Sequence, residues 1–226
     1  MWNRSDSVTA PGNVMTDWPD KSGNSHNFSP VNATGPTYIP SDAAFNGLPS
    51  LNVDTTAKGI KTVSNVTYGP FTVALCVQVP TQPAAGDIFA HFNGGAVDDA
   101  IACPITAGGT STIVGRVKNS VNTTMTKTDG ARWVESSTCK IIVSRFDGTK
   151  AGSNIRVNGV TLSESGGLNN DPGLATLTAQ LFLFSVNGST QLMTGKIAEL
   201  AIYDHPLSTT DLALLETYMK SRYAIP

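Results

Sequence analysis

The chain has 226 residues, with 15 Lys and Arg against 17 Asp and Glu, a formal net charge of −2, and only 14 % charged residues. Its polar character comes instead from 27 Thr, 20 Ser and 16 Asn, with 21 Gly and 13 Pro as turn formers. The near-neutral charge argues against nucleic-acid binding, no stretch approaches the roughly 20 apolar residues of a transmembrane helix, and the N-terminus shows no apolar segment typical of a secretory signal.

Short segments rich in β-branched and aromatic residues follow a turn-rich N-terminal region, and Gly, Asn and Pro turns separate them. Asn158-Gly159 is the strongest hairpin signal in the chain, because both residues tolerate the positive φ of a tight turn. The predicted strands are residues 48–54, 59–64, 71–79, 87–92, 111–118, 121–128, 139–146, 153–157, 160–163, 181–186 and 195–203.

One helix is predicted, close to the C-terminus. Ser208 with Asp211 three residues later resembles a capping box, and Leu212, Leu215 and Met219 then share one helical face. No internal repeat, linker or charge block divides the chain. We therefore expect residues 1–226 to form a single all-β sandwich domain with a short C-terminal α-helix.

Four segments, taken together and in this order, resemble the concanavalin A-like lectin/glucanase superfamily, in its laminin-G-like or pentraxin-like branch. The resemblance implies an antiparallel two-sheet jelly roll, and it implies no single function because this fold serves lectins, glycosidases, lyases, adhesion modules and structural proteins. The segments are Trp18-Pro19-Asp20-Lys21-Ser22-Gly23-Asn24, the stretch 45–53 (FNGLPSLNV), the pair Asp147-Gly148 and Val157-Asn158-Gly159, and the stretch 195–208 (GKIAELAIYDHPLS).

Two of these segments also suggest local structure on physical grounds alone. Trp18 is expected to pack beneath its turn, while Asp20, Ser22 and Asn24 bond to nearby backbone and hold the reversal. Strict alternation along 195–203 places Ile197, Glu199, Ala201 and Tyr203 on one face and Ala198, Leu200 and Ile202 on the other. Glu199 must then be paired or reach a rim, and we interpret it as a structural partner rather than a catalytic acid.

Catalysis is not expected. The paired carboxylates that glucanases of this fold carry on one strand are absent, since none of the four Glu residues has an acidic neighbour two residues away. None of the three His lies near a nucleophile elbow, and the Gly pairs lack the Lys of a phosphate loop. Carboxylates brought together from distant strands stay open as an alternative.

The three cysteines, Cys76, Cys103 and Cys139, show no CxxC spacing. Because their number is odd and Cys76 lies in an apolar run, buried thiols are favoured over one disulfide with a free thiol.

The candidate ligand residues lie in the loops after the middle strands. Asp98 and Asp99, which follow Asn93, form the densest oxygen cluster and could bind calcium, although a solvated loop tip is the favoured interpretation. Trp133 is the tryptophan most able to offer a ring face to a sugar, and it could equally be core. No other cofactor is predicted.

The sequence therefore predicts a non-catalytic binding or adhesion module that recognises a cell-surface glycan or receptor. The uncharged polar surface also fits a phage particle, as a tail fibre or capsid decoration, so we expect an extracellular or virion-surface location, with virion proteins or further copies of the chain as other partners. The alternatives are a purely structural virion protein without a ligand and a polysaccharide-active glycosidase or lyase.

Overall fold

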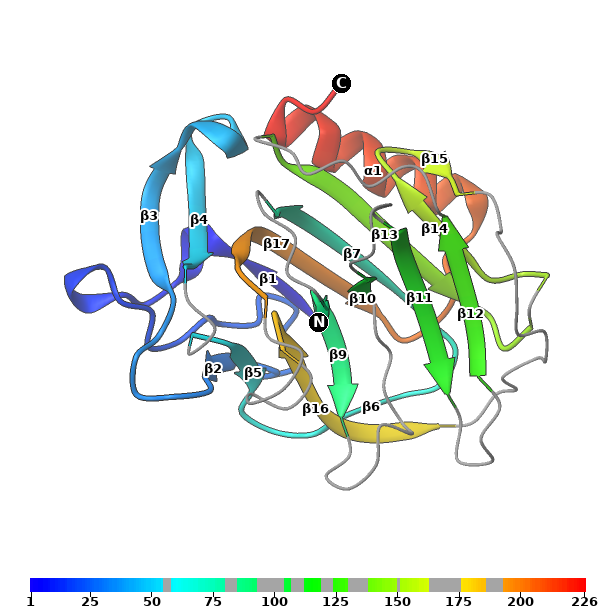
Figure 1. The fold of residues 1–226 in the computed structure, drawn as a ribbon, viewed down its shortest axis with the longest axis horizontal. Helices are drawn as coiled ribbons and strands as arrows, with labels where there is room; N and C mark the ends of the chain where they lie inside the picture. The colour runs from blue at the N-terminus through cyan, green and yellow to red at the C-terminus, as the bar shows by residue number, and fades with distance from the viewer. Residues whose placement is uncertain are drawn as a thin grey trace.

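The computed structural model describes residues 1–54, 58–79, 85–92, 104–106, 112–118, 124–129, 138–149, 151–162, 176–185 and 193–226. Their strands form two layers of antiparallel sheet, and α1 (Thr209–Tyr223) lies against the outside of one layer (Figure 1). This α1 is the one α-helix within those ranges, and with 15 residues it is too short to span a bilayer. Short 3₁₀ turns lie at η1 (Ser5–Ser7), η2 (Pro11–Asn13) and η3 (Ala43–Phe45).

The larger sheet carries the helix. β7 (Phe71–Gln78) is its central strand, hydrogen-bonded to β13 (Lys140–Phe146) on one side and β17 (Gly195–Tyr203) on the other. This is the position expected of its run of β-branched and apolar residues, all of which are buried. The remaining strands of this sheet are β14 (Asn154–Val157) and β15 (Val160–Thr161) beyond β13, and β4 (Leu48–Val53), β3 (Thr37–Asp42) and β1 (Trp2–Arg4) on the side of β17.

The opposite layer is built around β16 (Leu177–Leu183). Its five-stranded part contains β2 (Phe28–Pro30), β5 (Ile60–Thr62), β6 (Val66–Tyr68) and β9 (Phe89–Phe92) as well. A four-stranded part contains β8 (Ala85–Asp87), β10 (Pro104–Thr106), β11 (Thr112–Lys118) and β12 (Thr124–Asp129). Only Ile88 separates β8 from β9, so the two parts of this layer are continuous along the chain.

Alternation along β7 separates two hydrophobic clusters. Val73, Leu75 and Val77 point into the sandwich, where they pack with residues of β16, β5 and β13. Ala74 and Cys76 point outward into a second cluster beneath α1. Burying apolar side chains in both clusters stabilises the fold by roughly 25 cal/mol per Å² of surface removed from water.

A β-bulge in β17 changes which residues share a face. The pairing with β7 shifts between Ile197 and Glu199, so Ala198 is an extra residue in the ladder. Ala198 and Ala201 lie in the cluster beneath α1, whereas Ile197 joins Leu200 in the sandwich core. The expected alternation was therefore wrong for Ile197 and Ala198, because the bulge adds one residue before the pattern resumes.

The C-terminal helix forms as predicted. Ser208 caps it by accepting a hydrogen bond from the Asp211 amide (3.1 Å) and donating one to the Asp211 carboxylate (2.7 Å). Leu212 and Met219 are buried against the sheet. Buried Glu216 also binds Arg156 of β14 through two hydrogen bonds of 2.7 and 2.9 Å, which ties the helix to the far edge of the sheet.

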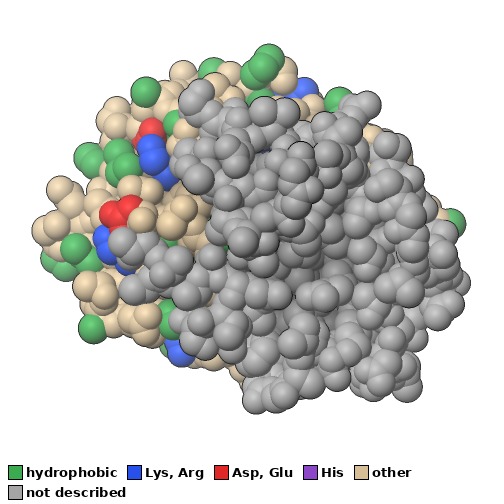
Figure 2. Space-filling model, viewed as in Figure 1, with side chains coloured by type: hydrophobic (Ala, Val, Ile, Leu, Met, Phe, Trp, Pro, Cys, Tyr) green, Lys and Arg blue, Asp and Glu red, His purple; other side chains and the backbone are tan. Residues whose placement is uncertain are grey.

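The predicted fold class, an antiparallel two-sheet jelly-roll sandwich with a C-terminal helix, is confirmed. Asn158 and Gly159 both have positive φ and form the predicted tight hairpin between β14 and β15. Trp18 is fully buried, as expected, and Cys76 and Cys139 are buried thiols without a disulfide. The described surface on the face shown in Figure 2 carries few charged side chains, consistent with the composition.

Candidate functional site

All four residues predicted to bind a ligand, Asn93, Asp98, Asp99 and Trp133, lie outside the described residues. Within the described ranges, no three His, Cys, Asp or Glu side chains are grouped so that they could hold a metal ion. Calcium binding by Asp98 and Asp99 therefore stays a prediction.

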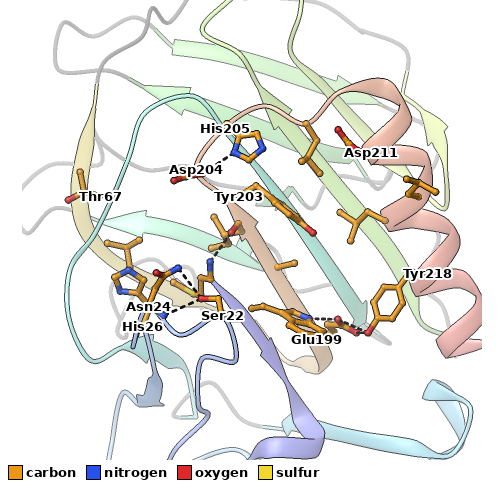
Figure 3. Close-up of a pocket in the computed structure, with 18 residues that line it drawn as sticks. Ser22, Asn24, His26, Thr67, Glu199, Tyr203, Asp204, His205, Asp211 and Tyr218 are labelled. Atoms are coloured by element: carbon orange, nitrogen blue, oxygen red, sulfur yellow. Dashed lines mark hydrogen bonds and ion pairs between the residues drawn. The ribbon is translucent and has the colours of Figure 1, made fainter.

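The described residues enclose a different site, a cleft of about 1010 Å³ where β17 ends and α1 begins. The N-terminal residues and the loop that follows Trp18 form one wall, and α1 with the turn before it forms the opposite wall. Figure 3 shows Ser22, Asn24 and His26 on the first side, facing Tyr203, His205 and Asp211 on the second. β6 contributes Val66 and Thr67.

One buried carboxylate holds two aromatic side chains of this cleft and a third beneath the helix. Glu199 has no exposed surface, and its Oε1 accepts hydrogen bonds from Trp2 Nε1 (2.6 Å) and Tyr218 Oη (3.1 Å), while its Oε2 accepts from Tyr223 Oη (2.8 Å). Trp2 and Tyr218 line the cleft, and Tyr223 lies in the cluster beneath the helix. Glu199 thus joins β1, β17 and α1, in agreement with its interpretation as a structural partner.

The same arrangement fixes the ionisation state of the tyrosines. Burial, reinforced by the nearby negative charge of Glu199, raises the pKa of Tyr203, Tyr218 and Tyr223 above the ordinary tyrosine value. All three therefore keep their hydroxyl protons at neutral pH and remain hydrogen-bond donors.

The loop wall of the cleft is built around Asp20. One carboxylate oxygen accepts from the backbone amides of Trp2 (2.8 Å) and Ser22 (2.9 Å), and the other accepts from the hydroxyl of Ser22 (2.9 Å) and the amide of His26 (3.2 Å). Although burial opposes ionisation, these bonds outweigh it and hold the pKa of Asp20 below its usual value. The expected turn is confirmed, and it positions Asn24 and His26 at the cleft.

The helix wall offers exposed polar and apolar groups. Asp204, whose side chain is 86 % exposed, accepts a hydrogen bond from His205 Nδ1 (3.0 Å), and this contact lowers the pKa of Asp204. The His205 ring meets Tyr203 edge-on at 6.1 Å. Leu214 is 64 % exposed beside Tyr218, so an apolar strip lies next to the carboxylates.

Such a site suits a ligand that carries both hydroxyl groups and apolar faces. Tyrosine and tryptophan present an apolar ring with a polar edge, and small-molecule sites typically combine apolar walls with a few placed polar groups. The carboxylate of Glu199 is already occupied by its three hydrogen-bond donors.

Sequence reasoning missed the cleft because its walls come from opposite ends of the chain. His205 lies in the turn before α1, and its place beside Tyr203 and opposite His26 depends on the fold. One signal was available, namely two turn segments of the family resemblance, 18–24 and 204–208, each rich in side chains that form hydrogen bonds.

No protein-family model matches this sequence, and no sequence of a curated protein does. Solved structures do resemble the fold. The receptor binding domain of botulinum neurotoxin D matches with a TM-score of 0.64 and 11 % identity over 95 % of this chain and 53 % of that domain. The Trypanosoma rangeli sialidase matches with a TM-score of 0.64 and 11 % identity over 97 % of this chain and 32 % of the enzyme.

Domain 4 of AbnA, a GH43 extracellular arabinanase from Geobacillus stearothermophilus solved with arabinotriose, matches with a TM-score of 0.60 and 16 % identity over 87 % of this chain and 91 % of that domain. The chain thus spans about half of the neurotoxin binding domain and a third of the sialidase, but nearly all of the arabinanase domain. At these identities the likeness establishes a β-sandwich jelly-roll fold similar to lectin-like modules.

Proposed function

We propose that this protein is a non-catalytic carbohydrate-binding module and that the cleft between the N-terminal loop and α1 is its binding site. The observation that carries the proposal is the lining of the cleft, in which Trp2, Tyr203 and Tyr218 lie beside exposed hydrogen-bonding groups such as Asn24 and Asp204. Aromatic faces with polar groups at their edges match the two sides of a sugar ring.

The similar folds support this choice. One of them is described as a receptor binding domain, and another was solved in complex with arabinotriose, an oligosaccharide. A sialidase is also among them, so turnover has to be tested directly. A role on the surface of a phage particle, or outside a cell, stays a prediction from composition.

The test is a glycan-array screen of the wild-type protein, followed by affinity measurements on the best oligosaccharide. Tyr218→Ala removes an aromatic face from the cleft and is expected to weaken binding roughly fivefold to 150-fold, by the roughly 1–3 kcal/mol that such contacts contribute at binding sites. Tyr218→Phe keeps the ring and should retain most of the affinity. Val160→Ala, at an exposed position on β15 outside the cleft, serves as the neutral control.

Two results would contradict the proposal. If no glycan binds, the module has another function, and co-purification with particles would then favour the purely structural alternative. If incubation with a polysaccharide releases reducing ends or unsaturated products, the protein is an enzyme.

A further inference from the structure

The charged side chains that line the cleft are carboxylates. Asp204, Asp211 and the buried Glu199 contribute them, and none of the described lining residues is Lys or Arg. Two arginines contact the lining from outside it. Arg4 lies 5.0 Å over the Trp2 ring, and Arg222 Nε lies 3.7 Å from Glu199 Oε2. Each of these arginines also binds Asp6 at 3.0 Å. Neither of them lines the cleft.

The remaining cationic group is the amino group of Met1. It donates a hydrogen bond to the carbonyl oxygen of Ile202 (2.9 Å), and burial lowers its pKa below the usual value. His26 and His205 also line the cleft. No Lys or Arg side chain of the described lining is therefore in place to hold a carboxylate or sulfate directly.

Carboxylates at a rim affect ligands in two ways. They accept hydrogen bonds from sugar hydroxyl groups, and a hydrogen bond to a charged acceptor is stronger than a neutral one. They also repel an anionic ligand, most strongly where low-dielectric walls limit screening. Asp204 is well placed for both effects because its side chain is 86 % exposed at the rim.

The volume of the cleft indicates the size of the ligand. Ligand sites in proteins span about 300–1,000 Å³, and this cleft is at the upper end of that range. A single sugar ring would leave much of it empty, whereas a segment of several linked sugars could contact both walls.

From these observations, and resting on the proposed function, we infer that the cleft binds neutral oligosaccharide segments and discriminates against acidic ones, with Asp204 and Asp211 as the residues that set this specificity. Two unit charges about 7 Å from a ligand carboxylate at the dielectric constant of water weaken its binding roughly fivefold to tenfold. The effect should decline as salt screens it.

The experiment uses an array that pairs neutral oligosaccharides with acidic counterparts, such as galacto- with galacturono-oligosaccharides and lactose with sialyllactose. It is run with EDTA, so that calcium bridges are excluded. We expect the neutral member of each bound pair to bind at least fivefold more tightly at low salt, and this preference to shrink at about 0.5 M salt.

Two double variants locate the effect. Asp204→Asn/Asp211→Asn should bring the acidic member to within about twofold of the neutral one. Asp17→Asn/Asp54→Asn removes the same net charge at positions that do not line the cleft and should leave the preference unchanged. Circular dichroism and thermal melting check that each variant is folded.

The outcomes separate this inference from the proposed function. The inferred specificity would be overturned if acidic oligosaccharides bind as tightly as their neutral partners or more tightly. It would also be overturned if the preference for neutral oligosaccharides persists in Asp204→Asn/Asp211→Asn. Either result would leave the proposed binding module in place. Absence of binding to every glycan would overturn both.

Discussion

Replacing Glu199 tests the anchor on which the cleft depends. Its carboxylate has no exposed surface and accepts hydrogen bonds from Trp2, Tyr218 and Tyr223. The positively charged side chain of Arg222 is also near, with its Nε 3.7 Å from Glu199 Oε2. Bonds to a charged acceptor contribute about 1.5–3 kcal/mol each, against roughly 1 kcal/mol for neutral bonds. Removing the charge should therefore weaken several of these hydrogen bonds at once.

Glu199→Gln keeps the shape of the side chain and removes the charge. The amide oxygen can still accept from Trp2, whose indole nitrogen is a donor only, and the amide nitrogen can face Tyr223, whose hydroxyl can turn to accept. We expect a loss of about 1–3 kcal/mol in the free energy of unfolding. Glu199→Ala leaves buried donors unpaired and should cost about 3–5 kcal/mol, a large part of the 5–15 kcal/mol typical of a domain.

Urea unfolding followed by circular dichroism measures both losses. A double-mutant cycle of Glu199→Gln with Tyr223→Phe should show a coupling energy of about 1 kcal/mol, because the two side chains share one hydrogen bond. Asp54→Asn, which changes an exposed carboxylate paired with Lys58, should stay within about 0.5 kcal/mol of the wild type. A Glu199→Gln protein as stable as the wild type, with no coupling to Tyr223, would refute the reasoning.

Three further predictions follow from individual residues. Because the folded-state pKa of Asp20 is depressed, its stabilising contribution is present above the unfolded pKa of about 4 and is lost as the pH falls through the folded value. Asp20→Asn should therefore lower the free energy of unfolding by about 1–2 kcal/mol at pH about 7 and flatten the acid side of the profile of stability against pH. A profile of unchanged shape would count against this assignment. Because burial raises the pKa of Cys76 well above the ordinary value, its thiol should resist labelling by a thiol reagent in the native protein and react in urea. Peptide mass spectrometry measures this labelling, and rapid labelling of the native protein would mean that the helix does not cover Cys76. If the sequence-based metal prediction is correct, calorimetry should detect calcium binding that Asp98→Asn/Asp99→Asn abolishes, and a wild-type protein that binds none would end that prediction.

The fold could be predicted from the sequence where local rules decide it. The Asn158-Gly159 hairpin, the buried run of β7 and the capped helix each follow from residues close together in the chain. Of the short strands in the first 42 residues, β1 and β2 could not be predicted, because they pair with strands distant in sequence. β3 pairs with the next strand, β4, but its composition favours turns. The bulge at Ala198 was likewise invisible, since one inserted residue reverses an alternation that otherwise looks regular.

The candidate site, like the fold, could be predicted from the sequence only in part. The sequence indicated that Glu199 needs a partner, because a strand buried on both faces cannot hold an unpaired carboxylate. It could not indicate that Trp2, 197 residues away, supplies one of the donors. The loop wall held by Asp20 and the capped start of α1 form through contacts much closer in the sequence, and only the fold brings them together as a cleft.

The central claim is that the cleft between the N-terminal loop and α1 binds a glycan. The most direct measurement is a titration of isotope-labelled protein with the oligosaccharide that binds best on the array, followed through backbone amide NMR shifts. We expect the largest shifts at Asn24, His26, Asp204 and His205, with little change at the distant hairpin of Asn158. Shifts confined to the segments around Asp98, Asp99 and Trp133, or a protein that binds no glycan, would contradict the account.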